Sequence, residues 1–435
     1  MENKSRHNQP QITTPSYKTL VACMGGNIIE WYDFMIYGYL SSIMGQIFFP
    51  SSSKIASLLL SLTLFAIGVI ARPLGGIVIG HIGDKFSRKN SLMLSVYLMF
   101  GATALIGILP TYHQIGILAP IILFSLRIIQ GLAMGGEYAG TMVFMIESAP
   151  DKKKGLYGSL AALSLVIGMF LGASMATLIQ QLPQEKLLLW GWRIPFFVSV
   201  IGILYTLYMR KNLPDTPYFN FIKEKKQTLT YPFKTMWLNY WPVIWRSILL
   251  QTVLAIGMYT VTVYYVNYIR EFLSASQTSA FICNMGATLM LGASAILSGW
   301  LSDLVGRKKM LLSASLMILT CGFISVYLSS LKHTYLLLLA QMMLSFSIGQ
   351  FLGATPAALA EIFPIRIRYT AIAFTNNICM GIFGGTAPLT IFYWTHYTGD
   401  IYVPAYYLAG GAIVSFIFVM NTYKKMAREP LSEEG

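Results

Sequence analysis

Residues 80–89 read GHIGDKFSRK, and residues 299–308 read GWLSDLVGRK. Glycine, aspartate, arginine and lysine occupy the same places in both copies, and each copy follows the second long apolar run of its half of the chain. A pattern this short can arise once by chance. Two copies at equivalent places indicate a chain built from two duplicated halves.

The chain around these copies is rich in apolar residues. Of its 435 residues, 55% are hydrophobic and 11% are charged, whereas a soluble globular protein averages about 25% charged residues. About 18 uncharged, mostly apolar residues suffice to cross a ~30 Å hydrocarbon core as a helix. The composition predicts a polytopic α-helical membrane protein and excludes a cytosolic enzyme, a disordered chain and a nucleic-acid-binding domain. Runs without Asp, Glu, Lys or Arg cover 34–53, 91–126, 155–184, 247–269, 272–302, 310–331, 369–399 and 401–423.

Twelve transmembrane helices are expected, because twelve apolar runs lie between turn-rich segments. The longest connection, 210–242, divides the runs into six and six. We therefore expect an N-terminal six-helix half over 1–209, a cytoplasmic linker over 210–242 and a C-terminal six-helix half over 243–435, an all-α architecture of duplicated halves. The expected spans lie near 20–49, 55–81, 91–109, 117–147, 156–180, 190–209, 243–268, 276–301, 309–331, 335–362, 369–395 and 402–422.

The basic residues are distributed unevenly between the two sides of this predicted bundle. The net charge is +14, and most Lys and Arg residues fall in alternate connections such as 83–90, 148–155, 210–242 and 306–309. Basic connections stay on the cytoplasmic side. The pattern predicts a multi-pass protein of the cytoplasmic (inner) membrane with both termini in the cytoplasm. It makes the positive charge a sign of topology and not of nucleic-acid binding.

The repeated loop resembles the Gly-x-x-x-Asp-[Arg/Lys]-x-Gly-Arg-[Arg/Lys] signature of the major facilitator superfamily, with departures at Ser87 and Leu304. Other segments resemble its metabolite:proton symporter branch, and 136–138 and 404–408 are most similar to proline/betaine transporters. The resemblance covers essentially the whole chain, and it implies the fold of that superfamily and transport of a small solute with protons. The segments that carry it are GNIIEWYDF at 26–34, RPLGG at 72–76, RIIQG at 127–131, GGE at 135–137, GWRIPF at 191–196, DTPYF at 215–219 and EIFPIR at 361–366.

Acidic residues inside predicted spans are candidates for proton coupling, because burying a charge there costs several kcal/mol and usually serves function. Glu30 and Asp33 are three residues apart in the first span and point to one helical face. Two carboxylates in a partly dehydrated site repel each other, which favours proton uptake in the physiological range. We expect Asp33, Glu30 and Glu137 to include the proton-coupling groups, with Asp33 first. The alternative for the first pair is a structural role, hydrogen-bonded to neighbours.

Arg127, near the middle of the fourth span, is the expected anion-binding residue. A guanidinium can hold a carboxylate through two hydrogen bonds, and that carboxylate can belong to the substrate or to an acid on the first span. Both possibilities stay open. Aromatic faces attract quaternary ammonium groups, so Trp31, Tyr37 and Tyr264 are the further substrate-binding candidates, although aromatic-rich spans also serve packing and interfacial anchoring.

The charged residues of the repeated loops have a different expected role. The resemblance implies that the loop aspartate packs against a neighbouring helix end and helps to latch the outward-facing state. Topological charge would explain the lysines but not an aspartate at the same place in both copies. Glu147 and Glu361, at the cytoplasmic ends of their spans, are expected to form gate ion pairs. The expected latch comprises Asp84, Arg88, Asp303 and Arg307.

The deep charges favour a zwitterionic substrate. One deep cation, Arg127, against three deep acids leaves too little positive charge for a citrate-like trianion. We expect a proton-coupled symporter that imports proline or glycine betaine by alternating access, with a small molecule and the lipid bilayer as partners. No cofactor is expected, since the proton gradient supplies the energy. The alternatives are symport of a small carboxylate such as 2-oxoglutarate, and a non-transporting solute sensor.

Other classes of function lack their sequence signatures. The chain has no GxxxxGK[ST] loop, which disfavours a primary pump. The five histidines and four cysteines form no metal or nucleophile pattern, so neither an enzyme nor a metal site is expected. A channel would need no duplicated loop latch. A monomer is compatible with this organisation. The histidines are His7, His81, His113, His333 and His396, and the cysteines are Cys23, Cys283, Cys321 and Cys379.

Overall fold

The computed structural model describes residues 15–50, 54–265, 268 and 277–428, and all regular structure in these ranges is helical. In the N-terminal half, α2 and α3 together form the first span, with a break at Leu40, and the five further long helices match the predicted spans. The elements of this half are α2 (Tyr17–Tyr39), α3 (Ser41–Phe48), α4 (Lys54–Lys85), α5 (Arg88–Ile108), α6 (Tyr112–Ile115), α7 (Leu118–Glu147), α8 (Lys154–Ile179), α9 (Gln184–Leu189) and α10 (Ile194–Lys211).

The C-terminal half repeats this order, but π-helical turns interrupt two of its spans. The seventh span passes through η4 and the eleventh through η6; such turns are rare and often occur at functional sites. Its elements are α12 (Pro232–Leu250), α13 (Thr252–Tyr259), η4 (Thr260–Tyr264), α15 (Gln277–Val305), α16 (Arg307–Ser330), α17 (Thr334–Ile362), α18 (Arg368–Cys379), η6 (Met380–Gly384), α19 (Gly385–Thr398) and α20 (Val403–Arg428).

Eleven of the described helical segments are long and apolar enough to cross a membrane. The twelfth span, α2, has 23 residues and is long enough. It is less apolar than the others because it carries Asn27, Glu30 and Asp33, all of which are buried. The prediction of an all-α membrane protein with twelve spans is therefore confirmed. The least apolar span, α2, is the one that carries the candidate acids Glu30 and Asp33.

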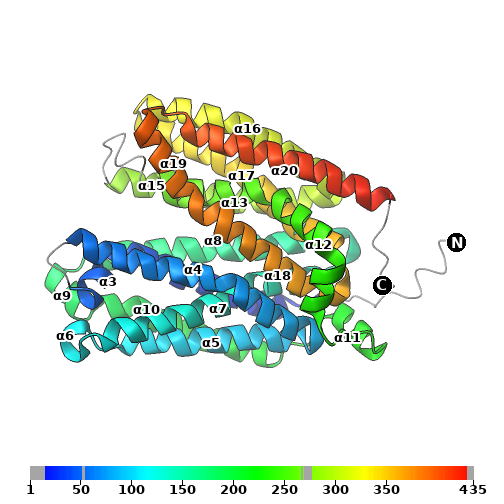
Figure 1. Ribbon diagram of the computed structural model, residues 1–435, viewed down its shortest axis with the longest axis horizontal. Helices are drawn as coiled ribbons and strands as arrows, with labels where there is room; N and C mark the ends of the chain where they lie inside the picture. Colours follow the sequence, from blue (N-terminus) through cyan, green and yellow to red (C-terminus); the bar gives the residue numbers. More distant parts are fainter. Residues whose placement is uncertain (1–14, 51–53, 266–267, 269–276, 429–435) are drawn as a thin grey trace.

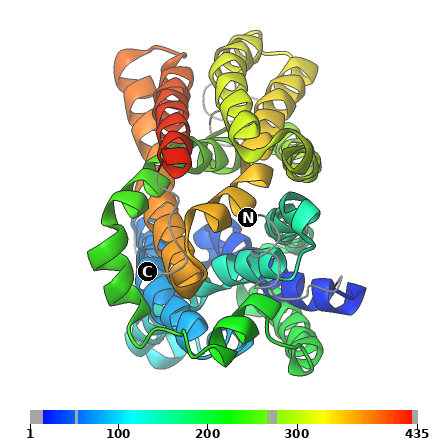
Figure 2. The same cartoon turned by 90° about the vertical axis from the view of Figure 1, so that its right-hand side faces the viewer.

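Most of the long helices fall into two groups that lie side by side (Figure 1). Figure 1 shows α4, α5, α7 and α10 together below, and α15, α16, α17 and α20 together above. Figure 2 looks along the bundle and shows the same division. The predicted linker is largely helical, since it holds α11 (Pro217–Glu224) and the first residues of α12. The seventh helix thus begins at Pro232 and not near 243, because Pro232 at its first turn fits a helix start.

Small residues let the second and fourth spans of each half cross closely. A Cβ atom added to Gly135 of α7 would overlap the backbone oxygen of Arg72 in α4, and one added to Gly353 of α17 would overlap that of Ala295 in α15. Such close backbone approach is typical of helix pairs inside membranes. The same crossing recurs at equivalent places, so the duplication seen in the loops extends to the packing of the helices.

The two copies of the repeated loop use different residues immediately before the helix that follows them. Ser87 caps α5 by accepting a hydrogen bond from the backbone N–H of Asn90 at 3.0 Å. Gly306 stands at the same place before α16 and adopts a φ of 95°, which favours glycine. Serine is a good N-cap residue. Ser87, which stands where the family signature has glycine, therefore still allows the helix to start at this position because it caps α5.

Candidate functional site

A small cavity lies between the two halves. Its walls come from α2, α4, α7 and α8 on one side and from α13, η4, α17, α18 and η6 on the other. Most lining side chains are apolar or aromatic. We call it the central cavity, and its lining residues are Trp31, Phe34, Met35, Arg72, Tyr138, Leu165, Met169, Met258, Tyr259, Thr262, Val263, Leu352, Asn376 and Met380.

Arg72 is the one charged residue among the described residues that line the central cavity. Its side chain is 2% exposed. The Nε–H group donates to Oδ1 of Asn377 in α18 at 3.2 Å, and the guanidinium carbon lies 5.5 Å from the ring centre of Trp31. Asn377 in turn donates to the carbonyl of Gly135 at 2.6 Å. Arg72 is thus held at the boundary of the two halves.

Three polar atoms of the central-cavity side chains have no hydrogen-bond partner within the described part of the chain. They are Nη1 of Arg72, Nε1 of Trp31 and the hydroxyl of Tyr259. All three can donate a hydrogen bond, and leaving a buried donor unpaired costs about 1–3 kcal/mol. Such a cluster of donors is suited to a ligand or to water that accepts hydrogen bonds.

Arg127 is not among the lining residues of this cavity. Its guanidinium carbon lies 4.0 Å from the ring centre of Tyr37, and Nη1 donates to Oε1 of Gln130 at 2.8 Å. Gln130 donates to Thr103 at 2.8 Å, and Thr103 donates to Oδ2 of Asp33 at 2.7 Å. Arg127, Tyr37 and Asp33 therefore belong to one buried polar network inside the N-terminal half.

The other predicted substrate-binding aromatics are separated in the structure. Trp31 lines the central cavity. Tyr264 instead stacks on Tyr268 with ring centres 5.6 Å apart, and its hydroxyl lies 3.4 Å from that of Thr395. It lies within the C-terminal half and does not line the central cavity. Arg127, Trp31, Tyr37 and Tyr264 are thus not brought together at one site.

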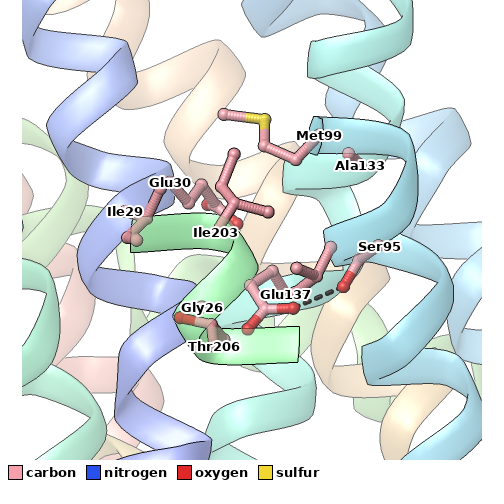
Figure 3. A pocket seen from close by; sticks show the side chains of 10 residues that line it. Gly26, Ile29, Glu30, Ser95, Met99, Ala133, Glu137, Ile203 and Thr206 are labelled. Atoms are coloured by element: carbon pink, nitrogen blue, oxygen red, sulfur yellow. Dashed lines mark hydrogen bonds between the residues drawn. The ribbon is translucent and has the colours of Figure 1, made fainter. Parts of the chain in front are cut away.

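The remaining predicted acids line a second, smaller cavity within the N-terminal half. Figure 3 shows Glu30 of α2 and Glu137 of α7 at this cavity, which we call the N-half cavity. Glu137 forms an ion pair with Arg210 of α10 and accepts a hydrogen bond from Ser95. Both carboxylate oxygens of Glu30 lack a hydrogen-bond partner within the described residues. Its lining residues are Gly26, Ile29, Glu30, Ser95, Val96, Met99, Ala133, Glu137, Ile203 and Thr206.

The structure corrects the prediction that one buried cation stands against three buried acids. Arg127 is not the one deep cation, because Arg72 and Arg210 are also buried at 2% and 0% exposure. Glu137 is neutralised by Arg210. Arg72 lies within the second span, where a linear count does not reveal which face it occupies, and Arg210 sits at the end of the sixth span next to the basic linker. Arg72 did carry a signal, because it lies inside the predicted span 55–81 and in the 72–76 segment of the family resemblance, whereas Arg210 could not be separated from ordinary topological charge.

At the end of the bundle that carries the basic loops, which we call the basic end, the halves are joined by a buried aspartate. Asp84, at the end of α4, accepts hydrogen bonds from the backbone N–H groups of Tyr369 at 3.1 Å and Thr370 at 2.8 Å. These are the first residues of α18, where the helix dipole favours a negative charge. Arg88 pairs with Asp84 and, at 3.3 Å, with Glu147.

The second copy of the loop makes the reciprocal contact. Asp303, at the end of α15, accepts hydrogen bonds from the N–H groups of Gly155 at 2.8 Å and Leu156 at 2.9 Å, in the first turn of α8. Arg307 pairs with Asp303 at 2.7 Å and with Glu361 at 3.1 Å. The ion pairs expected for the two span-end glutamates are confirmed. Each half therefore holds the other through an aspartate at a helix N-terminus.

Two polar residues of the basic end were not singled out from the sequence as candidates. Thr216 donates to Oε2 of Glu147 at 2.6 Å, and Asp215 accepts from the N–H groups of Arg88 at 3.0 Å and Lys89 at 3.3 Å. Both belong to the 215–219 segment that carries part of the family resemblance. That resemblance was the available signal, because the contact joins positions far apart in the chain.

Comparison with known proteins places these features in a family. A family model described as "Sugar (and other) transporter" matches residues 18–239 and 224–434. A putative proline/betaine transporter of Staphylococcus haemolyticus is 33% identical over 419 residues, which cover 95% of this chain and 89% of that protein. The glycine betaine/proline/ectoine/pipecolic acid transporter OusA of Dickeya dadantii is 31% identical, with 95% of this chain and 84% of that protein covered.

Solved structures share the fold at low sequence identity. The major facilitator superfamily proton:xylose symporter XylE, bound to 6-bromo-6-deoxy-D-glucose, superposes with a TM-score of 0.77 at 16% identity, covering 94% of this chain and 95% of that chain. The Escherichia coli fucose:proton symporter FucP (N162A) gives a TM-score of 0.69 at 13% identity, covering 93% and 97%. The chain therefore belongs to the sugar (and other) transporter family of the major facilitator superfamily, and it resembles the proline/betaine transporters of the metabolite:proton symporter branch.

Proposed function

We propose that this chain is a proton-coupled symporter that imports a small zwitterionic osmolyte, such as glycine betaine or proline, by alternating access. The observation that carries the proposal is the central cavity, in which one arginine stands among aromatic rings and three donors lack partners. Relatives named as proline/betaine transporters support the same substrate class. The membrane would be the cytoplasmic membrane, with the basic end inside.

The cavity offers each end of a zwitterion a different environment. A solute carboxylate can accept hydrogen bonds from Nη1 of Arg72 and from the Trp31 indole, since both donors are unpaired. A quaternary or secondary ammonium group can rest on the faces of Phe34, Tyr138 or Tyr259, because aromatic faces attract cations. A dicarboxylate such as 2-oxoglutarate would leave its second charge without a cation among the described lining residues.

The contacts between the halves support a central cavity that opens alternately to the two sides of the membrane. At the basic end, Asp84 and Asp303 each cross from one half to the other. We propose that these two contacts, with Arg88 and Arg307, form the conformational latch of the outward-facing state. A small cavity lined by Tyr39 and Asn284 shares Met35, Met169 and Thr262 with the central cavity, and we propose that the path toward the opposite end begins there.

Transport by purified protein in liposomes tests the proposal. Uptake of radiolabelled glycine betaine, proline and 2-oxoglutarate is measured with and without an imposed inward proton gradient. Gradient-dependent accumulation of glycine betaine or proline is expected. Accumulation of 2-oxoglutarate alone would overturn the osmolyte assignment, and osmolyte uptake that ignores the proton gradient would overturn proton coupling.

Two arginine variants test the site itself. Arg72→Gln should raise the dissociation constant for glycine betaine about 10- to 100-fold, because hydrogen bonds to a charged partner contribute about 1.5–3 kcal/mol each. Arg246→Gln is the matched control, since Arg246 is partly exposed on α12 and donates to the carbonyl of Pro242. Equal binding by the Arg72 variant and the control would contradict the assignment of the central cavity.

A further inference from the structure

The small cavity that adjoins the central cavity beside Tyr39 and Asn284 has an uncharged lining with a few polar groups. Methionine, phenylalanine and alanine side chains form most of its walls, and none of the described residues that line it is charged. Its polar side chains come from both halves, with Tyr39 on α2, Thr262 on η4, and Asn284 and Thr288 on α15. The hydrogen bonds that these groups already make decide which part of a solute they can bind.

The two threonines of this cavity can only accept further hydrogen bonds. Thr262 donates its hydroxyl hydrogen to the carbonyl of Met258 at 2.7 Å, and Thr288 donates to the backbone carbonyl of Asn284 at 2.7 Å. A hydroxyl group has one hydrogen and two lone pairs. Because the hydrogens are already used, both threonine oxygens present lone pairs to a ligand that donates.

Asn284 adds a third acceptor. It is 5% exposed, and its side-chain Oδ1 has no hydrogen-bond partner within the described residues. Its amide nitrogen donates to the hydroxyl of Tyr39 at 3.3 Å, which holds the side chain between α15 and α2. A buried acceptor without a partner is unfavourable, so a donor that enters this space would be stabilised. We call this space the acceptor cavity.

The neighbouring central cavity offers the opposite kind of group. Its three unpaired donors, among them Nη1 of Arg72, suit a carboxylate. The two cavities share Met35, Met169 and Thr262, so Thr262 borders both spaces. Methionine side chains are unbranched and adaptable, and a change in their conformation can join the two spaces. Unpaired donors and unpaired acceptors therefore adjoin each other, as the two ends of a zwitterion with N–H groups require.

We propose that the acceptor cavity binds the N–H groups of a protonated secondary amine, as in proline, while Arg72 holds the carboxylate of the same solute. Thr262, Asn284 and Thr288 then determine the selectivity between ammonium groups that carry hydrogens and those that are fully methylated. A quaternary ammonium has no hydrogen to donate, so glycine betaine uses the aromatic faces of the central cavity, and water satisfies the acceptors. This inference deepens the proposed function and rests on it.

A series of methylated prolines tests the inference, because its members share the ring and the carboxylate and differ in their N–H groups. Dissociation constants for proline, N-methylproline and N,N-dimethylproline are measured on the purified protein by isothermal titration calorimetry, with glycine betaine as the reference. Thr262→Val removes the acceptor and keeps the shape of the side chain. It should raise the Kd for proline about tenfold more than the Kd for N,N-dimethylproline, because hydrogen bonds from charged donors are worth at least that much. Asn284→Leu should change this ratio in the same direction, and N-methylproline should give intermediate values.

Three further variants separate the loss of an acceptor from general damage. Thr262→Ser keeps the hydroxyl and should keep the wild-type ratio of the two dissociation constants. Tyr39→Phe removes the contact with Asn284 but leaves Oδ1 of that residue in place, and it should also keep the ratio. Thr320→Val is the matched control, because Thr320 lies on an exposed face of α16 and donates to the carbonyl of Leu316.

The outcomes distinguish a failure of this inference from a failure of the proposed function. A ratio that is unchanged in both Thr262→Val and Asn284→Leu, whether the two solutes bind equally well or are equally weakened, would overturn the acceptor cavity as a solute site. Wild-type protein that binds glycine betaine but not proline would also overturn it and leave osmolyte transport intact. Wild-type protein that binds neither solute would instead refute the proposed substrate class.

Discussion

The contact between Asp84 and the start of α18 predicts how the transporter responds when one latch is weakened. In Asp84→Asn, the side chain keeps its shape but loses its charge. Asp84 is 0% exposed and accepts two backbone hydrogen bonds, at 3.1 and 2.8 Å, besides its pair with Arg88. The carboxylate also faces the positive end of a helix. Arg88 keeps Glu147 as a partner, so no buried charge is left alone.

The size of the effect follows from these contacts. Hydrogen bonds to charged groups contribute about 1.5–3 kcal/mol each, and a charge at a helix terminus adds up to about 2 kcal/mol in partly buried geometry. Asparagine retains part of the first contribution. We expect Asp84→Asn to weaken the closed basic end by about 3 kcal/mol, which is more than a hundredfold change in the equilibrium. Asp303→Asn should shift it in the same direction, because Asp303 makes the equivalent contacts.

Distance measurements across the basic end provide the assay. Spin labels at Lys152→Cys and Lys309→Cys report on exposed positions of opposite halves, with the partly buried Cys321 replaced by serine. Asp84→Asn should broaden the distance distribution toward longer values. Asp151→Asn is the matched control, because Asp151 is 64% exposed and pairs only with Lys154 at 3.0 Å among the described residues. An unchanged distribution in Asp84→Asn, or an equal change in the control, would refute the latch argument.

The remaining predictions concern the central cavity and the helix crossings. Trp31→Ala should raise the KM for glycine betaine about 10- to 100-fold, because it removes the unpaired indole N–H proposed to bind the solute carboxylate, and hydrogen bonds to charged groups contribute about 1.5–3 kcal/mol; Trp245→Ala, on an exposed face of α12, should leave transport unchanged. Asn377→Ala removes the acceptor that holds the cavity arginine and should weaken solute binding about 3- to 10-fold in an equilibrium binding assay, given about 1 kcal/mol per hydrogen bond. Gly135→Leu should abolish monodisperse folded protein in size-exclusion chromatography, because its new side chain meets the α4 backbone. Gly101→Leu, with nothing within 4 Å of an added Cβ, should elute like the wild-type protein.

The linear sequence determined the class of protein because the relevant signals are local or repeated. A long apolar run indicates a membrane-spanning helix by itself, because such a helix needs about 20 mostly apolar residues whichever helices it packs against. The twin loops at 80–89 and 299–308 revealed the duplication, and their family resemblance anticipated the two contacts that Asp84 and Asp303 make at helix starts. The acids of the first span were also visible, because a charge inside an apolar run is rare.

Only the tertiary structure decided which buried charges meet. Arg127 and Arg72 both lie within spans, yet α7 turns the first toward Tyr37 and Gln130 inside one half, while α4 turns the second into the central cavity. Depth in a span follows from sequence position, but the face a side chain occupies depends on how its helix is rotated. That rotation is set by contacts with distant segments, such as the crossing at Gly135. For the same reason, the pairing of Glu137 with Arg210 and the unpartnered carboxylate of Glu30 emerged only when the helices were packed together.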